Sequence, residues 1–313
     1  MTPKGNMSAL YFHSAVAEWY GRNARDLPWR SEPYVSDPYA ILVSEVMLQQ
    51  TQVDRVVPKF NEFMAAFPTL AKLAAAQLGD VIRLWSGLGY NRRAVRLHLL
   101  AATVLELMGG ELPSDVERLR ALPGVGPYTA AAVACFAFGA AVPVAETNIY
   151  RVLSRVTWGV DGPSRKDLDA TVAAFLPDKA SPFSASAWHQ ALMDLGATIC
   201  TARSPRCGLC PLRDVCRTAP LLRQSGERDL AKASVPYAPK QSMFAGSARF
   251  YRGRIVEVLR GLSGGQAMSL AELGFALFDA FDVQRDTERM NALVDGLARD
   301  NLVVREDEWV QLP

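Results

Sequence analysis

Four of the five cysteines in this chain of 313 residues lie within seventeen consecutive positions, at Cys200, Cys207, Cys210 and Cys216. The start of the chain has polar residues where an export signal would carry its apolar segment, so we expect a cytoplasmic protein with reduced thiols. Clustered thiols in a reducing compartment indicate metal ligation rather than disulfides. We therefore expect this segment to fold as a short loop around one metal centre.

The spacing of these cysteines favours one kind of centre. Structural zinc sites usually show two close pairs of ligands, whereas here a single C-x2-C pair is flanked by cysteines after six and five intervening residues. This pattern is better suited to four thiolates around a four-iron four-sulfur cluster, with zinc or a disulfide as the alternatives. The fifth cysteine, Cys135, lies in an apolar segment and is expected to be a packed side chain.

Apolar residues recur with a helical period through most of the chain, which predicts an all-α protein. Residues 38–52 carry apolar side chains at positions 42, 43, 46 and 47, with Asp37 as the expected N-cap. Further helices are predicted over 53–67, 69–85, 92–108, 114–121, 127–138, 147–158, 166–176 and 184–199. The longest apolar run, 130–145, is interrupted by Gly139 and Pro143 and is too short to span a membrane. We therefore expect no membrane association.

The C-terminal third has a different composition. Residues 219–247 are rich in Arg, Pro, Ser and Lys and are interpreted as a basic linker. Predicted helices at 248–261, 268–279 and 286–299, followed by a hairpin pattern near the C-terminus, indicate a small winged-helix-like domain over 248–313. Winged helices often bind DNA, but this third helix carries both acidic and basic side chains. A role in protein contact or in packing is therefore an equal alternative.

A glycine-containing segment, Leu122-Pro123-Gly124-Val125-Gly126-Pro127-Tyr128-Thr129, lies between two predicted helices. Its two glycines permit a tight turn that directs backbone N–H groups outward at the start of the next helix, where the helix dipole favours an anion. This pattern is typical of a phosphate-binding hairpin, although an ordinary turn between helices fits about as well. Two glutamates accompany it: Glu45 lies within residues 38–52, and Glu146 directly precedes 147–158.

Taken together, these motifs resemble those of the adenine DNA glycosylases that act on A/G mismatches, in the helix-hairpin-helix, endonuclease-III-type superfamily. The likeness covers about residues 10–218 and is carried by LPWR (27–30), SEVMLQQTQ (44–52), GLGY (87–90), LPGVG (122–126), MDLGA (193–197) and the four cysteines. It implies an all-α, two-lobed helix-hairpin-helix glycosylase fold. A helical-barrel lobe would span 31–140, and an iron-sulfur lobe would combine 1–30 with 141–218.

The resemblance also implies a pair of catalytic carboxyl groups. Cleavage of an N-glycosidic bond passes through an oxocarbenium-like sugar, so it needs an acid for the leaving base and an anion for the cation. Glu45, beside Val43 and Val46, is expected to have a raised pKa and to act as the acid. Glu146 is expected to stabilise the cation and to help position water. The family has an aspartate at the position of Glu146, and a simple helix-end charge is the alternative role for this glutamate.

The resemblance implies DNA-binding residues as well, because a base within duplex DNA is reached only after it is flipped out. Gln49 and Tyr90 are at the positions of the wedge that fills the gap, although a core position is the alternative for Tyr90. Asn91 follows Tyr90 where these glycosylases commonly carry another aromatic residue. Gln50 and Thr51 are expected to contact base edges. Gly124, Gly126 and Tyr128 belong to the DNA-binding hairpin, and phosphate contacts or a solvated face are expected for Arg92, Arg93 and Arg96.

Position 128 separates two mechanisms in this superfamily. Bifunctional relatives carry a lysine there that attacks the sugar, whereas Tyr128 cannot form a Schiff base. We therefore expect a monofunctional glycosylase that removes adenine opposite 8-oxoguanine or guanine from double-stranded DNA. We expect it to act as a monomer and, in a bacterium, to associate with the nucleoid.

Two alternatives stay open at this point. Tyrosine at position 128 also occurs in thymine or uracil mismatch glycosylases, and the family's usual C-terminal domain, which reads 8-oxoguanine, is not recognisable in the tail of this chain. A thymine, uracil or other damaged-base glycosylase is therefore the alternative substrate class. A non-catalytic iron-sulfur DNA-binding protein is the alternative of another class, against which the presence of Glu45 and the Gln49-Gln50-Thr51 run argues.

Overall fold

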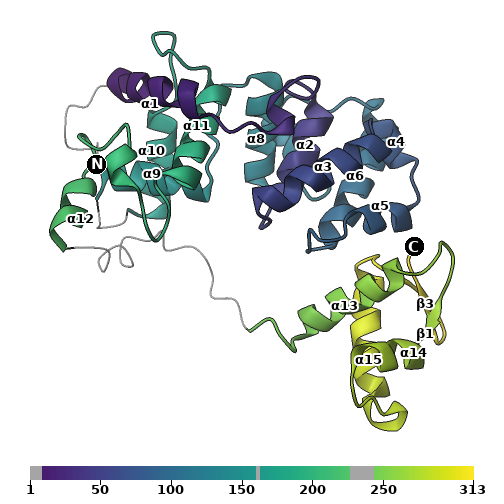
Figure 1. Ribbon diagram of the computed structural model, residues 1–313. Coiled ribbons are helices and arrows are strands. Elements are labelled where there is room, and N and C mark those ends of the chain that lie inside the picture. The colour runs from purple at the N-terminus through teal and green to yellow at the C-terminus, as the bar shows by residue number, and fades with distance from the viewer. Residues whose placement is uncertain (1–8, 160–162, 226–242) are drawn as a thin grey trace. The chain divides into compact units, whose positions relative to one another are not determined.

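The computed structural model describes residues 9–159, 163–225 and 243–313, which are largely helical (Figure 1). Its helices are α1 (Ala9–Asn23), α2 (Pro38–Leu48), α3 (Val53–Ala66), α4 (Leu70–Ala74), α5 (Leu78–Leu84), α6 (Arg92–Met108), α7 (Val116–Arg120), α8 (Pro127–Phe138), α9 (Thr147–Thr157), α10 (Arg165–Ala174), α11 (Ala185–Thr198), α12 (Ala219–Ser225), α13 (Ala248–Arg260), α14 (Leu270–Leu277) and α15 (Val283–Arg299). Three short strands accompany them, β1 (Met268–Ser269), β2 (Val304–Glu306) and β3 (Trp309–Gln311). The all-α fold class is confirmed. Within the described ranges, no helix is long and apolar enough to cross a membrane.

The predicted helices agree with the structure except at a few places. The helix expected over 69–85 is divided into α4 and α5, because Gln77 has an extended backbone and starts a second helix. The helix expected over 38–52 ends at Leu48, since Gln50 has a φ of 57°, which helical residues do not adopt. Helix α1 was not predicted. Helix α12 occupies the first part of the segment interpreted as a linker, and residues 226–242 of that segment lie outside the described ranges.

Contacts divide the chain into two compact units, each described by itself. The first unit contains residues 1–37, 114–120 and 126–239, and the second contains 38–113, 121–125 and 240–313. Helices α7 and α8 thus group with the first unit. The lobe boundaries expected from the sequence remain a prediction.

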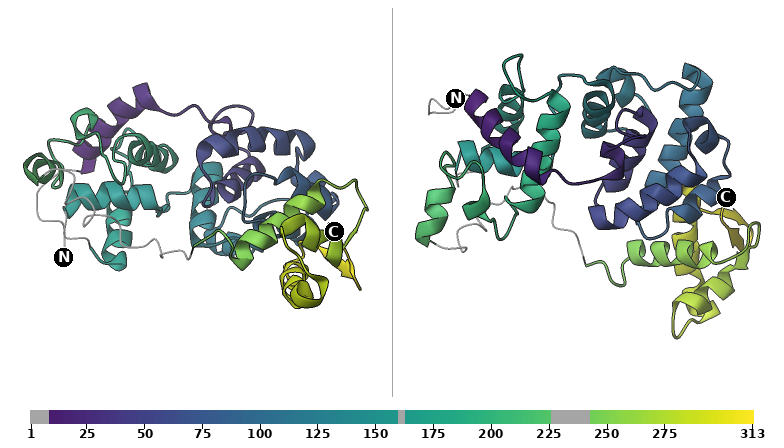
Figure 2. Two further views of the ribbon diagram at one scale, coloured as in Figure 1. Left: turned by 60° about the horizontal axis from the view of Figure 1, so that its bottom comes forward. Right: turned by 45° about the horizontal axis from the view of Figure 1, so that its top comes forward.

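The core of the first unit forms where α9 and α11 pack together and α1 lies beside α11 (Figure 2). Apolar residues of α9 recur at Ile149, Val152 and Val156, so one face of the helix is apolar and all three side chains are buried. Phe12 and Trp188 belong to the same apolar core, and their rings pack edge to face against each other with centroids 5.5 Å apart. This core holds α9 and α11 at fixed positions, and both helices contribute to the site described below.

The second unit contains α2 to α6 and a C-terminal domain of residues 248–313. Helices α13, α14 and α15 of this domain pack together (Figure 1). The domain also contains an antiparallel sheet with strand order β1-β3-β2. In that sheet Met268 pairs with Val310, and Val304 pairs with Gln311. The domain packs on α5, because Ile82 of α5 belongs to its apolar core. The expected winged-helix-like pattern is present, with β1 as an unpredicted third strand.

Candidate active site

Glu45 lies in α2, a helix that is buried along nearly its whole length. The side chains around it, including Val43, Val46 and Met47, are almost entirely inaccessible, and Glu45 itself is 5% exposed. Ser44 donates its hydroxyl hydrogen to the carbonyl oxygen of Ile41 at 2.8 Å, as expected of a polar side chain inside an apolar helix. The structure therefore buries the side chain of Glu45 within this helix.

The C-terminal end of α2 is held by Arg93 of α6. Nη1 of Arg93 donates to the carbonyl oxygens of Val46, Met47 and Gln49 at 2.7–2.8 Å. Nη2 donates to the carbonyl oxygens of Leu88 and Gly89 at 2.9 Å each. The free carbonyls at the end of a helix need such donors, and a single guanidinium here joins the end of α2 to the loop at 87–90.

Arg93 is consequently a structural residue. It is only 8% exposed, and burial lowers its pKa to about 10, so it stays charged at neutral pH. The phosphate contact or solvated face expected for Arg93 is wrong, because its donors are directed to backbone carbonyls. No sequence pattern distinguishes Arg93 from its exposed neighbours Arg92 and Arg96 on the same helix.

The residues at the predicted wedge positions lie around this guanidinium. Tyr90 has a φ of 46° and a side chain that is 49% exposed, with Cζ of Arg93 5.7 Å from its ring centroid. A buried core position for Tyr90 is therefore excluded. Gln50 is exposed at the tip of the turn after α2, and Gln49 is partly buried beside it. Thr51 donates to the carbonyl oxygen of Leu88 at 3.1 Å, so its hydroxyl supports the loop.

The glycine-containing hairpin at 122–126 connects α7 to α8. Gly124 has a φ of 79°, and a Cβ atom there would lie 2.8 Å from Cβ of Arg96, so both the backbone angle and the close approach of α6 require glycine. Gly126 is the N-cap of α8 and supplies no side-chain cap to its first turn. A Cβ at Gly126 would meet no neighbour within 4 Å. Tyr128 is partly buried against Cys135 and Val144, and its ring packs inside the first unit.

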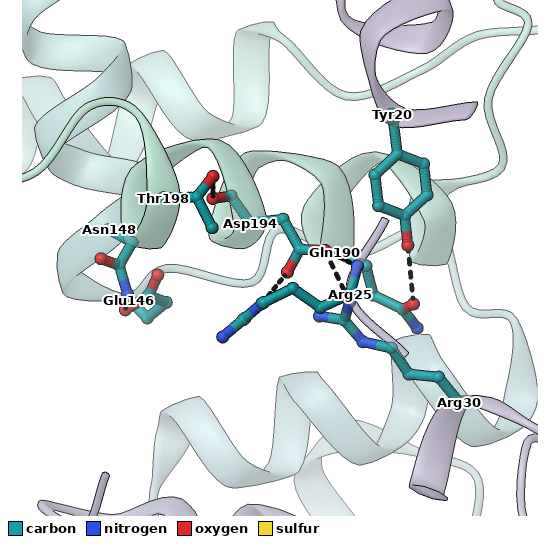
Figure 3. A network of polar contacts seen from close by, with 8 residues as sticks. All are labelled: Tyr20, Arg25, Arg30, Glu146, Asn148, Gln190, Asp194 and Thr198. Atoms are coloured by element: carbon teal, nitrogen blue, oxygen red, sulfur yellow. Dashed lines mark hydrogen bonds and ion pairs between the residues drawn. The ribbon is translucent and has the colours of Figure 1, made fainter. Parts of the chain in front are cut away.

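Glu146 caps α9 (Figure 3). Its Oε1 accepts a hydrogen bond from the backbone N–H of Ile149 at 3.1 Å, and its Oε2 accepts from Nδ2 of Asn148 at 3.2 Å. Burial raises the pKa of the Glu146 carboxyl, while the hydrogen bonds from Asn148 and Ile149 and the charge of Arg151 oppose that shift. A glutamate is thus accommodated at a position where the family has an aspartate.

Asn148 is in turn held by Arg151, a residue that no sequence motif indicated. Nη2 of Arg151 donates to Oδ1 of Asn148 at 2.5 Å and to the carbonyl oxygen of Gly196 at 2.7 Å, while its Nε donates to the carbonyl oxygen of Cys200 at 2.7 Å. A Cβ at Gly196 would lie 2.6 Å from Cβ of Asn148. The MDLGA motif therefore contains a glycine because α11 approaches α9 closely at Asn148. Arg151 joins this crossing to the cysteine loop.

Asp194 of the same motif fixes the segment after α1 (Figure 3). Its carboxylate is fully buried and accepts from Nε of Arg25 at 2.7 Å and from Nη1 of Arg30 at 2.9 Å. A buried carboxylate needs such partners, because leaving it unpaired would cost several kcal/mol. The LPWR and MDLGA motifs occur together because their charged residues form one ion-pair network.

The four cysteines of the loop line one small cavity beside α9 and α11. Their sulfur atoms lie near hydrogen-bond donors: Nη1 of Arg155 is 3.5 Å from Sγ of Cys200, and backbone N–H groups are directed to Cys210 and Cys216. In the described part of the chain, no three His, Cys, Asp or Glu side chains are grouped around a single ion. Four thiols facing one cavity with N–H donors nearby fit a cluster bound through four sulfur ligands.

Comparison with known proteins agrees with this geometry. The model of the HhH-GPD superfamily of base excision DNA repair proteins matches residues 43–177, and the iron-sulfur binding domain of endonuclease III matches residues 200–216. The adenine DNA glycosylase of Mycolicibacterium smegmatis is 44% identical over 285 residues, which cover 90% of each chain. This chain belongs to the adenine DNA glycosylase family. It is a base-excision-repair DNA N-glycosylase with a four-iron four-sulfur cluster, and the zinc, disulfide and non-catalytic alternatives are set aside.

Other relatives of this glycosylase share only part of its length. The human adenine DNA glycosylase is 41% identical over 234 residues, which cover 73% of this chain but 42% of the human protein. Among solved structures, a thermostable thymine-DNA glycosylase superposes with a TM-score of 0.61 at 28% identity, covering 68% of this chain and 97% of that one. A DNA complex of endonuclease III has a TM-score of 0.59 at 24% identity, covering 70% of this glycosylase and all of that chain, which supports the fold.

Proposed function

We propose that this glycosylase removes adenine mispaired with 8-oxoguanine or guanine in double-stranded DNA by monofunctional hydrolysis. The observation that carries the proposal is the 44% identity to an adenine DNA glycosylase over 90% of both chains, which includes part of the C-terminal domain. The thymine-DNA glycosylase resembles this chain less, at 28% identity over 68% of it. We further propose that the enzyme works as a monomer in the cytoplasm.

In this mechanism Glu45 is the general acid. Its position inside a buried helix limits the access of water to the carboxyl group, which we propose protonates the departing base. Protonation makes the base a better leaving group as the N-glycosidic bond lengthens. The end of α2 must be fixed for this role, and Arg93 fixes it by binding the carbonyl groups of Val46 and Met47.

Glu146 is proposed to stabilise the oxocarbenium-like sugar that forms as the base departs. Asn148 and the N–H of Ile149 hold its two oxygen atoms in a fixed orientation, so the charge is preorganised and needs no rearrangement during the reaction. The same carboxylate can orient the attacking water. No lysine stands at position 128, so we propose that water, and not an amine of the protein, attacks the sugar.

The cluster is proposed to have a structural role. Cys200, Cys207, Cys210 and Cys216 would hold it, and a centre with four thiolate ligands has no open position for substrate. It would order the loop next to α9 and α11, and thereby support the crossing at Gly196.

The proposal is tested with wild type and Glu45→Gln on a duplex containing adenine opposite 8-oxoguanine. Wild type should release adenine and leave an abasic site that breaks only after alkali, and borohydride should trap no covalent complex. Glu45→Gln should bind the duplex normally but release no adenine, because an amide has no acidic proton to donate. Near-normal release by this variant, or efficient borohydride trapping of wild type, would contradict the mechanism.

A further inference from the structure

The C-terminal domain is attached to the loop that carries Tyr90. Nη2 of Arg260 in α13 donates to Oδ1 of Asn91 at 3.0 Å. Asp300, which follows α15, pairs with Nε of Arg92 at 3.2 Å. Both residues that follow Tyr90 in the sequence thus contact this domain. The position where related glycosylases commonly have an aromatic residue is used here, as Asn91, to anchor the domain next to the predicted wedge.

A cleft of about 690 Å³ lies between α6 and the C-terminal domain. Gln49, Tyr90 and Gly124 line it from the side of the predicted wedge and the hairpin. Arg249 of the C-terminal domain and Phe244, just before that domain, line the opposite side. Because Gln49 and Tyr90 line the cleft, it is continuous with the surface that is predicted to enter DNA.

The charge of this cleft is strongly positive. Among the described residues, five arginines and one carboxylate, Asp300, line it. Asp300 pairs with Arg92 and with Arg252, while Arg93 is directed to backbone carbonyls. Arg96 and Arg249, which also line the cleft, are exposed. An excess of cations in a cleft favours a polyanion.

Exposed aromatic side chains accompany these cations. Tyr90 is 49% exposed and Phe244 is 60% exposed, and both line the cleft. Arginines combined with exposed aromatic rings are typical of nucleic-acid binding grooves, where phosphates meet the cations and bases or sugars pack on the rings. The composition of the cleft thus points to DNA rather than to a small anion.

We propose that this cleft binds the sugar–phosphate backbone of the DNA next to the wedge, with Arg96 and Arg249 as its phosphate-binding cations. The C-terminal domain then contributes to DNA affinity, while the chemistry stays with Glu45 and Glu146. The inference rests on the proposed function only in taking the wedge to be the part of the enzyme that enters DNA.

The test measures dissociation constants at several salt concentrations for the full-length protein. The probe is a duplex with 2′-fluoro-2′-deoxyadenosine opposite 8-oxoguanine, because the fluorine disfavours the oxocarbenium ion and so prevents excision. Arg249→Ala should weaken binding and reduce the slope of log K against log salt by about one phosphate contact. Arg254→Ala is the matched control, since Arg254 lies on the same helix but does not line the cleft.

A second variant, Asp300→Asn, should change the affinity for DNA in the opposite direction. It removes the one carboxylate found among the described lining residues and the ion pairs of that carboxylate with Arg92 and Arg252, so binding should become tighter. An Arg249→Ala variant that binds like wild type, or that changes no more than Arg254→Ala, would overturn the inference. Weaker binding by an Asp300→Asn protein that unfolds at the wild-type temperature, and so keeps the attachment of the domain, would overturn it as well. Adenine release by the same wild-type preparation on an unmodified duplex tests the proposed function separately, because binding to the fluorinated probe involves no excision.

Discussion

Oε1 of Glu146 accepts a hydrogen bond from the backbone N–H of Ile149 at 3.1 Å, so this carboxyl group caps the first turn of α9. A structural cap and a catalytic anion make different demands on the side chain. Glutamine keeps the capping oxygen but loses the charge, whereas aspartate keeps the charge but is one methylene shorter. The two substitutions therefore separate the two roles.

We expect Glu146→Gln to lose most activity, by about a hundredfold or more, because the positive charge on the sugar is no longer compensated. Glu146→Asp should retain a measurable part of the rate or exceed it, since the family carries aspartate here. Single-turnover excision rates measure both effects. Wild-type rates for Glu146→Gln would reduce Glu146 to a helix-end charge and remove it from the active site.

The raised pKa of Glu146 also predicts a dependence of stability on pH. Because its pKa in the folded state is above the unfolded value of about 4.3, the folded protein binds the proton more tightly, and ionisation costs stability as pH rises through the folded pKa. Glu146→Gln lacks this cost. Its unfolding temperature should therefore exceed that of wild type at about pH 8, and the difference should disappear at about pH 4. An equal difference at both pH values would refute the buried-charge explanation.

Gly196→Ala should disturb the site through packing. The added Cβ would lie 2.6 Å from Cβ of Asn148, so Asn148 must move and Glu146 would lose the hydrogen bond from Asn148. We expect a loss of about 1–3 kcal/mol in stability together with slower excision. Gly21→Ala is the control, because a Cβ at Gly21 in α1 has nothing within 4 Å. Its stability should be unchanged or about 0.5–1 kcal/mol higher, with a normal excision rate. Equal behaviour of the two variants would rule out the crossing as the cause.

Arg93→Lys tests whether Arg93 holds the end of α2 to the loop at 87–90. A lysine ammonium cannot reach both groups of carbonyls that the guanidinium binds, so buried acceptors would be left without donors. We expect the variant to lose at least about 2 kcal/mol of stability and to excise slowly. Arg120→Ala, which breaks an exposed ion pair with Glu117, should change stability by less than about 1 kcal/mol. Wild-type stability for Arg93→Lys would contradict the assigned role.

Much of the fold could be predicted from the sequence because helix periodicity and breakers are local. The helices at 92–108 and 127–138 have their predicted bounds, each followed by a glycine in the left-handed conformation. The break between α4 and α5 was missed, since the apolar period continues through it. The strand β1 was missed because two residues are too few to show an alternating pattern.

The supporting parts of the site could not be predicted, since they depend on contacts between distant segments. Arg93 looks like its exposed neighbours Arg92 and Arg96 until α6 is placed against the end of α2. Gly196 belongs to a motif, but a glycine is required there because Asn148, 48 residues earlier in the sequence, packs closely against it. Motifs thus pointed to the two carboxyl groups that are proposed to act in the reaction, while packing determines which residues contact Glu146 and the end of α2.

The central claim is that this glycosylase excises adenine. Single-turnover rates of base release should be compared on five duplexes that differ at one pair: A opposite 8-oxoguanine, A:G, U:G, T:G, and hypoxanthine in the same context. The account predicts the fastest release, of adenine, from the 8-oxoguanine duplex, with A:G next and little or no release of thymine, uracil or hypoxanthine. Faster release of thymine or uracil than of adenine would contradict it and would assign the chain to a mismatch glycosylase of the other substrate class.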